Sequence, residues 1–93
     1  MADDKLVELR KQIDEIDSSI LELLEKRMKV TDEVGRFKIM HGISTIDLNR
    51  ENDLFNRLMN ACQHPILKQQ IKNIYSQIVS TSKKSQEKLK TSK

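Results

Sequence analysis

Apolar residues recur at alternating three- and four-residue steps along the first forty positions of the chain. The series is Leu6, Leu9, Ile13, Ile16, Ile20, Leu23, Val30, Val34 and Phe37. A repeat sustained over this length predicts a long helix with one buried seam. The only gap in the series, between Leu23 and Val30, is filled by Arg27. A guanidinium in the middle of an apolar seam is unusual, and other parts of the sequence are needed to explain it.

The first predicted helix is the longest. It begins at Asp3 or Asp4, because acidic residues suit a helix N-terminus, and it runs to about Met40. Gly42 then offers a residue for a left-handed C-cap. Gly35 lies inside this helix, where glycine costs about 1 kcal/mol relative to alanine. We therefore expect another chain or a ligand to approach the backbone closely there.

Two further helices follow. Ser44, Thr45 or Asp47 can cap the second helix, and the sequence does not choose among them. That helix ends near Cys62, and Pro65 suits the first position of the third helix. The third helix ends in a lysine-rich segment whose last five or so residues we expect to fray. The apolar faces are Leu54, Phe55, Leu58 and Met59 on the second helix, and Ile66, Leu67, Ile71, Ile74, Tyr75, Ile78 and Val79 on the third.

Helix lengths constrain how the chain assembles. With two glycines and one proline in 93 residues, the sequence predicts one all-α domain over residues 1–93. The first helix spans roughly 55 Å and the second only about 24 Å. A short helix cannot cover the seam of a long one, so we expect a twofold homodimer. In that dimer, the first helix of each chain supplies part of the core of the other.

Charge and cysteine content narrow the possible partners. The net charge is +3, with acids and bases interspersed along the helices rather than gathered in a basic stripe with aromatics. Nucleic-acid binding is therefore disfavoured. No apolar run approaches the ~20 residues of a membrane span, and the acidic start is unlike a signal peptide. Cys62 is the only cysteine, so no intrachain disulfide can form. We expect a cytoplasmic protein without membrane contact.

Polar residues interrupt or extend the apolar stripes of all three predicted helices. A single polar residue on an apolar stripe is explained by a side chain at the edge of the stripe that reaches water. Polar residues on the stripes of three helices instead predict a polar pocket inside a bundle. Arginine binds carboxylates through paired N–H groups, and a buried cation without a partner is costly. We therefore expect the pocket to take an anionic ligand. Its candidate residues are Arg10, Arg27, Lys38, Asp47, Arg50, Glu51, Ser82 and Gln86.

Familiar catalytic motifs are missing from the sequence. It contains no glycine-rich phosphate loop, no Cys/His metal set and no Ser-His-Asp arrangement. His41 and His64 fall at helix breaks and are interpreted as exposed turn residues, and Cys62 as a small core residue. An enzyme built on this pocket is expected to work without covalent catalysis, metal or cofactor.

Four segments together resemble a known family. They are LRKQIDEIDSSILELLEKR and VGRFK in the first helix, IDLNRE entering the second, and IVSTSKKSQ in the third. In these the chain resembles the all-helical chorismate mutases of the free-standing, single-domain type. The resemblance implies an intertwined homodimer of three-helix protomers. It also implies an isomerase that converts chorismate to prephenate by a Claisen rearrangement in phenylalanine and tyrosine biosynthesis, with no metal or cofactor.

The resemblance also implies roles for individual residues. Arg27 and Arg10 would clamp the two carboxylates of chorismate, with Arg10 reaching in from the other protomer. Lys38 and Gln86 would contact the ether oxygen of the breaking C–O bond. These roles need no nucleophile, because the reaction is unimolecular and pericyclic.

The remaining candidates surround the rest of the substrate. By resemblance, Glu51 and the backbone N–H of Asp47 would hold the ring hydroxyl. Ser82 would assist at a carboxylate, and Arg50 would support the acids and the rim of the site. Arg27, Lys38, Glu51 and Gln86 are thus the expected catalytic residues.

Some positions depart from the family, and some alternatives stay open. Many members carry proline before the second helix, where this chain has residues 42–45 as Gly-Ile-Ser-Thr. Gln86 stands where some relatives have glutamate. A related enzyme acting on aminodeoxychorismate or isochorismate would use the same carboxylate clamp. A non-catalytic helical interaction or regulatory module is the alternative from another class, although both termini fit a free-standing enzyme.

Overall fold

The computed structural model describes residues 1–91, which form three helices. They are α1 (Ala2–Met40), α2 (Leu48–Ala61) and α3 (Pro65–Thr91), with no strand among the described residues. The predicted all-α fold is confirmed, and so is Pro65 as the first residue of the third helix. The fraying expected at the C-terminus concerns in part residues 92–93, which lie outside the described residues; α3 continues to Thr91.

A glycine ends α1 as the sequence predicts. Gly42 has a φ of 64°, in the left-handed region that favours glycine. The N–H of Ile43 donates to the carbonyl of Lys38 at 2.8 Å, and the N–H of Gly42 donates to that of Ile39 at 3.3 Å. This pair of bonds is a Schellman motif, which satisfies carbonyls that the end of a helix leaves free. It turns the chain sharply away from the axis of α1.

Side chains cap the two shorter helices. Among the three candidates for the N-cap of α2, the structure selects Asp47, whose carboxylate accepts the N–H of Arg50 at 3.0 Å. Ser44 instead bonds the backbone of Ile46 within the connecting loop. At the start of α3, Nδ1 of His64 accepts a hydrogen bond from the N–H of Leu67 at 3.2 Å.

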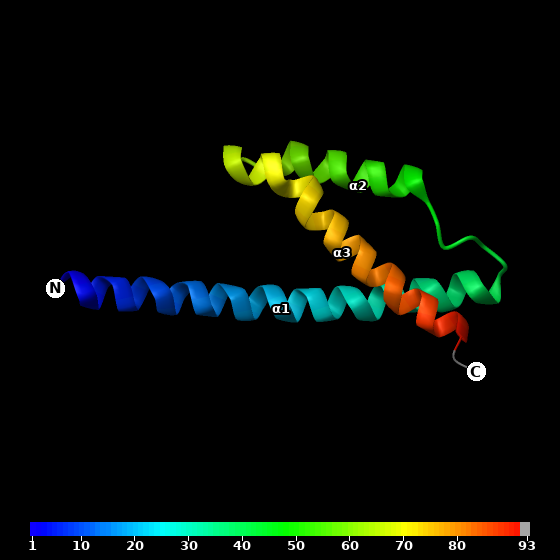
Figure 1. The fold of residues 1–93 in the computed structure, drawn as a ribbon, viewed down its shortest axis with the longest axis horizontal. Helices are drawn as coiled ribbons and strands as arrows, with labels where there is room; N and C mark the ends of the chain where they lie inside the picture. The colour runs from blue at the N-terminus through cyan, green and yellow to red at the C-terminus, as the bar shows by residue number, and fades with distance from the viewer. Residues whose placement is uncertain (92–93) are drawn as a thin grey trace.

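The three helices form an open arrangement rather than a closed bundle. α1 is a long rod, and α3 crosses its C-terminal half while α2 lies on the other side of α3 (Figure 1). Within the described residues, α3 packs against both other helices, whereas the backbones of α1 and α2 make no close contact. The N-terminal half of α1 extends beyond the other two helices (Figure 1).

The apolar seam of α1 is exposed in the protomer. The nine residues of the repeat, from Leu6 to Phe37, are between 42% and 63% accessible to solvent. The prediction of a buried seam is therefore not met within one chain, because only α3 crosses α1 and it does so at one end. The buried residues lie elsewhere, at the α1–α3 crossing and between α2 and α3. They are Gly35, Leu54, Phe55, Ile71, Ser82 and Gln86.

Surface area and shape describe an extended protomer. The Cα radius of gyration is 17.4 Å, whereas a compact chain of this length has about 12 Å. The accessible surface is 7816 Å², against about 5,600 Å² for a folded monomer of the same mass. Among residues 1–91, none of the helices has the length and apolar character needed to cross a membrane.

Candidate active site

A cavity of about 360 Å³ opens between the three helices, and its wall contains most of the predicted site. All predicted site residues line this cavity except Arg10. Apolar side chains from each helix complete the wall, as is common in ligand pockets. The lining residues are Arg27, Val30, Thr31, Val34, Lys38, Thr45, Asp47, Arg50, Glu51, Leu54, Val79, Ser82, Lys83 and Gln86.

Arg27 is held from α3 by Ser82. Nη1 of the guanidinium donates to Oγ of Ser82 at 2.8 Å, and that hydroxyl donates in turn toward the carbonyl of Ile78 at 3.2 Å. Ser82 is only 5% exposed, so its position is fixed by packing. One of the five guanidinium N–H groups is used in this contact, and the others stay free for a ligand. Arg27 is thus a half-buried cation whose orientation is set by a neutral partner.

Gln86 crosses from α3 to the backbone of α1. Its Nε2 donates to the carbonyl oxygen of Thr31 at 2.7 Å, and the side chain is 8% exposed. A primary amide has two N–H groups, so one remains after this bond. The contact is possible because the residue of α1 that faces Gln86 is Gly35, which has no side chain. A Cβ there would stand 2.8 Å from Cγ of Gln86.

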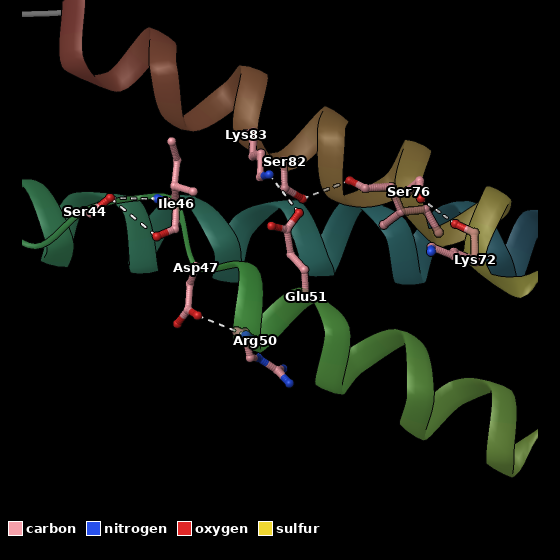
Figure 2. Close-up of polar contacts among 10 residues, drawn as sticks. Ser44, Ile46, Asp47, Arg50, Glu51, Lys72, Ser76, Ser82 and Lys83 are labelled. Carbon is pink, nitrogen blue, oxygen red and sulfur yellow. Dashed lines mark hydrogen bonds and ion pairs between the residues drawn. The ribbon is translucent and has the colours of Figure 1, made fainter.

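Glu51 is paired with a lysine that the sequence analysis did not single out. Oε1 of Glu51 lies 2.7 Å from Nζ of Lys83, which joins α2 to α3 at the cavity (Figure 2). Oε2 of Glu51 is buried and has no hydrogen-bond partner among the described residues. A buried carboxylate oxygen without a donor is unfavourable, so this atom is suited to accept from a ligand.

Lys38, Asp47 and Arg50 complete the polar wall. Lys38 is half-buried, and no ion pair among the described residues includes it. The carboxylate of Asp47 is occupied as the N-cap of α2, so the backbone N–H of this residue is the group left to meet a ligand. Arg50 lines the cavity but is exposed, and its side chain points away from Glu51 and Lys83 (Figure 2).

The charges of the cavity favour an anion. Four basic side chains line it, against the carboxylates of Asp47 and Glu51. Glu51 is already neutralised by Lys83, and Asp47 binds its own helix. Arg27 and Lys38 are therefore left without a carboxylate partner in the described part of the chain. Because cations taken partly out of water need compensation, the cavity suits a small ligand with more than one negative charge.

Arg10 is the one predicted residue that the protomer does not bring to the cavity. It lies on the exposed N-terminal half of α1. Seventeen residues separate it from Arg27, which is about 26 Å along a helix axis. An Arg10 side chain cannot reach the cavity of its own chain.

A comparison with known protein families decides the relationship. The model of the family described as chorismate mutase type II matches residues 9–87. The chain belongs to the chorismate mutase type II family. The match covers the cavity-lining residues of all three helices, and the resemblance read from the sequence is confirmed.

Individual relatives give the same result. The chain is 38% identical over 60 residues to the chorismate mutase of Methanocaldococcus jannaschii, which covers 64% of this chain and 61% of that protein. It is 36% identical over 56 residues to the bifunctional chorismate mutase/prephenate dehydratase of Aquifex aeolicus, covering 60% of this chain and 16% of the relative. The Escherichia coli K12 protein of that name is 34% identical over 58 residues, covering 62% and 15%. The match thus spans about three fifths of the first relative and a small part of the other two.

Three polar residues that line the cavity, Thr31, Thr45 and Lys83, were not among the predicted site residues of this chorismate mutase family member. Thr45 was considered only as a helix cap. Thr31 contributes a backbone carbonyl, which no side-chain pattern reveals. Lys83 follows Ser82 directly, about 100° around the helix, so it falls off the stripe formed by Ser82 and Gln86. Its partner Glu51 is on another helix, so spacing along α3 alone gives no signal for it.

The other polar candidates lie away from the cavity. His41 and His64 are exposed at helix ends, as predicted. Cys62 is half-buried at the end of α2, where its Sγ lies 3.6 Å from the carbonyl oxygen of His64. Within residues 1–91, no group of three or more His, Cys, Asp and Glu side chains is placed to hold a metal ion.

Proposed function

We propose that this protein is a chorismate mutase, which rearranges chorismate to prephenate. The observation that carries the proposal is a cavity in which Arg27 and Lys38 have no carboxylate partner among residues 1–91, while the amide of Gln86 is buried beside them. Chorismate is a dianion with an ether oxygen between its enolpyruvyl arm and its ring. Its charges and its acceptor oxygen match these groups, and membership of the family supports the same substrate.

Conformational restriction of the substrate supplies the first part of the rate acceleration. The reaction forms a C–C bond while a C–O bond breaks within one molecule, so no nucleophile takes part. Arg27, oriented by Ser82, binds one carboxylate and holds the enolpyruvyl arm over the ring. Because one N–H of Arg27 is fixed on Ser82, the remaining N–H groups lose less freedom when substrate binds.

Charge stabilisation at the ether oxygen supplies the second part. Negative charge grows on this oxygen as the C–O bond breaks, and the ammonium of Lys38 and the free N–H of Gln86 donate to it. An acceleration of ~10⁶-fold corresponds to about 8 kcal/mol of barrier lowering. Two preorganised donors at about 3 kcal/mol each, together with the held conformer, reach that value.

The ring hydroxyl binds on the α2 side of the cavity. It donates to Oε2 of Glu51, the buried oxygen that has no donor in the described residues. The backbone N–H of Asp47 donates to the hydroxyl oxygen in return. Arg50 supports these acids from the rim. The hydroxyl is in this way both a donor and an acceptor, which fixes the rotation of the ring.

The active form is a homodimer in which Arg10 crosses to the partner's cavity. The exposed seam of α1 supports this, because its nine apolar residues stay 42–63% exposed within the described chain. The surface excess over a compact monomer is about 2,200 Å², the scale of an obligate interface. Pairing two long helices covers the seams and brings each Arg10 to a second chain, where it binds the other carboxylate.

A single assay tests the reaction. Purified protein is incubated with chorismate, the loss of diene absorbance is followed, and the product is identified by mass and NMR. We expect prephenate to form at a rate that scales with enzyme concentration. Absence of turnover would indicate a non-catalytic helical module, whereas turnover only of isochorismate or aminodeoxychorismate would move the reaction to a related substrate.

A further inference from the structure

Lys83 lines the cavity and also pairs with Glu51, a predicted site residue on another helix. It follows the inward-facing Ser82 on α3, and its Nζ lies 2.7 Å from Oε1 of Glu51 on α2 (Figure 2). The side chain of Lys83 is 39% exposed and that of Glu51 is 18% exposed. The pair is therefore more shielded at its carboxylate end than an ordinary surface salt bridge.

The two oxygens of Glu51 are in different environments. Oε1 is paired with Nζ of Lys83 (Figure 2), while Oε2 is buried and has no hydrogen-bond partner among the described residues. With Oε1 occupied, a ligand finds one acceptor rather than two. The carboxylate also cannot turn toward Arg50 or Lys38 without giving up its ammonium partner, so Lys83 fixes which oxygen meets a ligand.

We propose that Lys83 is a positioning residue that determines which ring substituent the site accepts, selecting substrates with a neutral hydroxyl over substrates with a charged amine. This rests on the proposed function, in which Glu51 receives the ring hydroxyl. Lys83 cancels the charge of Glu51 and leaves Oε2 as a single acceptor for one O–H. A substrate with an aliphatic amine at that carbon, such as 4-amino-4-deoxychorismate, is an ammonium at neutral pH and brings a second cation to the same carboxylate.

Electrostatics gives the sign of the discrimination. Two ammonium groups on opposite oxygens of one carboxylate repel each other, and the shielded site weakens this repulsion less than open water does. Chorismate carries no charge at this carbon and avoids the repulsion. Removing the charge of Lys83 should therefore lower kcat/KM for chorismate, because Glu51 is no longer held in place. The same change should raise kcat/KM for the amine substrate, because the repulsion between the two cations is removed.

The chain offers a matched control one residue further on. Lys84 is on the same helix and is exposed, and it does not line the cavity. Lys84→Met makes the same chemical change as Lys83→Met with the same loss of one charge. Lys83→Arg keeps the charge and tests whether a cation is sufficient.

The experiment measures kcat/KM for chorismate and for 4-amino-4-deoxychorismate in each variant. The ratio of the two values is the readout, because a change in fold stability alone moves both together. We expect Lys83→Met to lower the chorismate preference by about tenfold, with Lys83→Arg retaining most of it and Lys84→Met leaving it unchanged. In a Glu51→Gln background, Lys83→Met should shift the ratio little, since Lys83 acts through that carboxylate.

Each outcome is decisive. An unchanged ratio in Lys83→Met, or an equal change in Lys84→Met, overturns the role of Lys83 while the mutase activity stands. If the unmodified protein does not convert chorismate, the proposed function falls and this inference falls with it. Should Lys83→Met lower the thermal midpoint, Lys83→Gln repeats the test with a polar side chain of similar length.

Discussion

Gly35 on α1 and Gln86 on α3 are in direct contact, and the contact requires that Gly35 have no side chain. A Cβ at Gly35 would lie 2.8 Å from Cγ of Gln86 and 3.4 Å from its Cβ and Cδ. The amide of Gln86 is meanwhile fixed on the carbonyl of Thr31 at 2.7 Å. The glycine therefore allows the proposed donor to the ether oxygen to lie flat against α1.

Gly35→Ala tests this contact. Alanine favours the helix by about 1 kcal/mol, but the buried Gln86 must leave its rotamer, which costs about 1–3 kcal/mol. We expect the free energy of unfolding to fall by about 0–2 kcal/mol and kcat to fall by about tenfold or more, because the donor is displaced. Steady-state kinetics and thermal unfolding measure both effects. In a Gln86→Ala background the same substitution should leave kcat almost unchanged. An equal loss of kcat there would show that Gly35 does not act through Gln86.

Arg27→Ala separates an enzyme from a structural module. Losing the guanidinium should lower kcat/KM for chorismate by at least about 10²-fold, since a charged contact to the substrate carboxylate disappears. Stability should change by about 1 kcal/mol or less, because the cation has only a neutral partner, Ser82. Arg36→Ala, an exposed change on the same helix and outside the cavity lining, is the control. Full activity in Arg27→Ala would contradict the proposed clamp.

The sequence predicted the three helices and most of the cavity because both depend on local spacing. Ser82 and Gln86 continue an apolar stripe, and their burial follows from that position. The choice of Asp47 over Ser44 as the N-cap depends on the path of the loop, which spacing does not determine. Lys83 was missed because its partner is on another helix, and pairing across helices depends on the crossing geometry of α2 and α3.

The pH dependence of the rate tests Gln86 as the donor. An amide does not titrate, so we expect kcat to be nearly flat between about pH 5 and 8. In Gln86→Glu the side chain donates only when protonated, and a glutamic acid ordinarily has a pKa of about 4.3. Its activity should therefore be highest in acid and fall about tenfold per pH unit above the pKa of the new carboxyl. A steep loss above about pH 6 in the unmodified protein would argue against Gln86 as the donor.

A charge on the seam of α1 should break the dimer. Ile16 is 59% exposed in the protomer, so Ile16→Glu is harmless in a monomer but buries an unpaired carboxylate in a paired seam. We expect sedimentation equilibrium to show a dimer for the unmodified protein at micromolar concentration and dissociation, with loss of helical signal, for the variant. Ser18→Glu adds the same charge on the opposite face of α1 and should stay dimeric. An unmodified protein that sediments as a monomer would refute the assembly.

The most direct measurement of a shared catalytic site is complementation between two inactive variants. Arg10→Ala and Arg27→Ala chains are co-expressed with different affinity tags, and the heterodimer is isolated through both tags. One of its cavities then combines an intact Arg27 with an intact Arg10 from the partner, while the other cavity lacks both arginines. We predict that each variant alone is nearly inactive and that the heterodimer forms prephenate at about half the rate of the unmodified dimer, because one site of two is intact. A heterodimer as inactive as its parents would contradict the account.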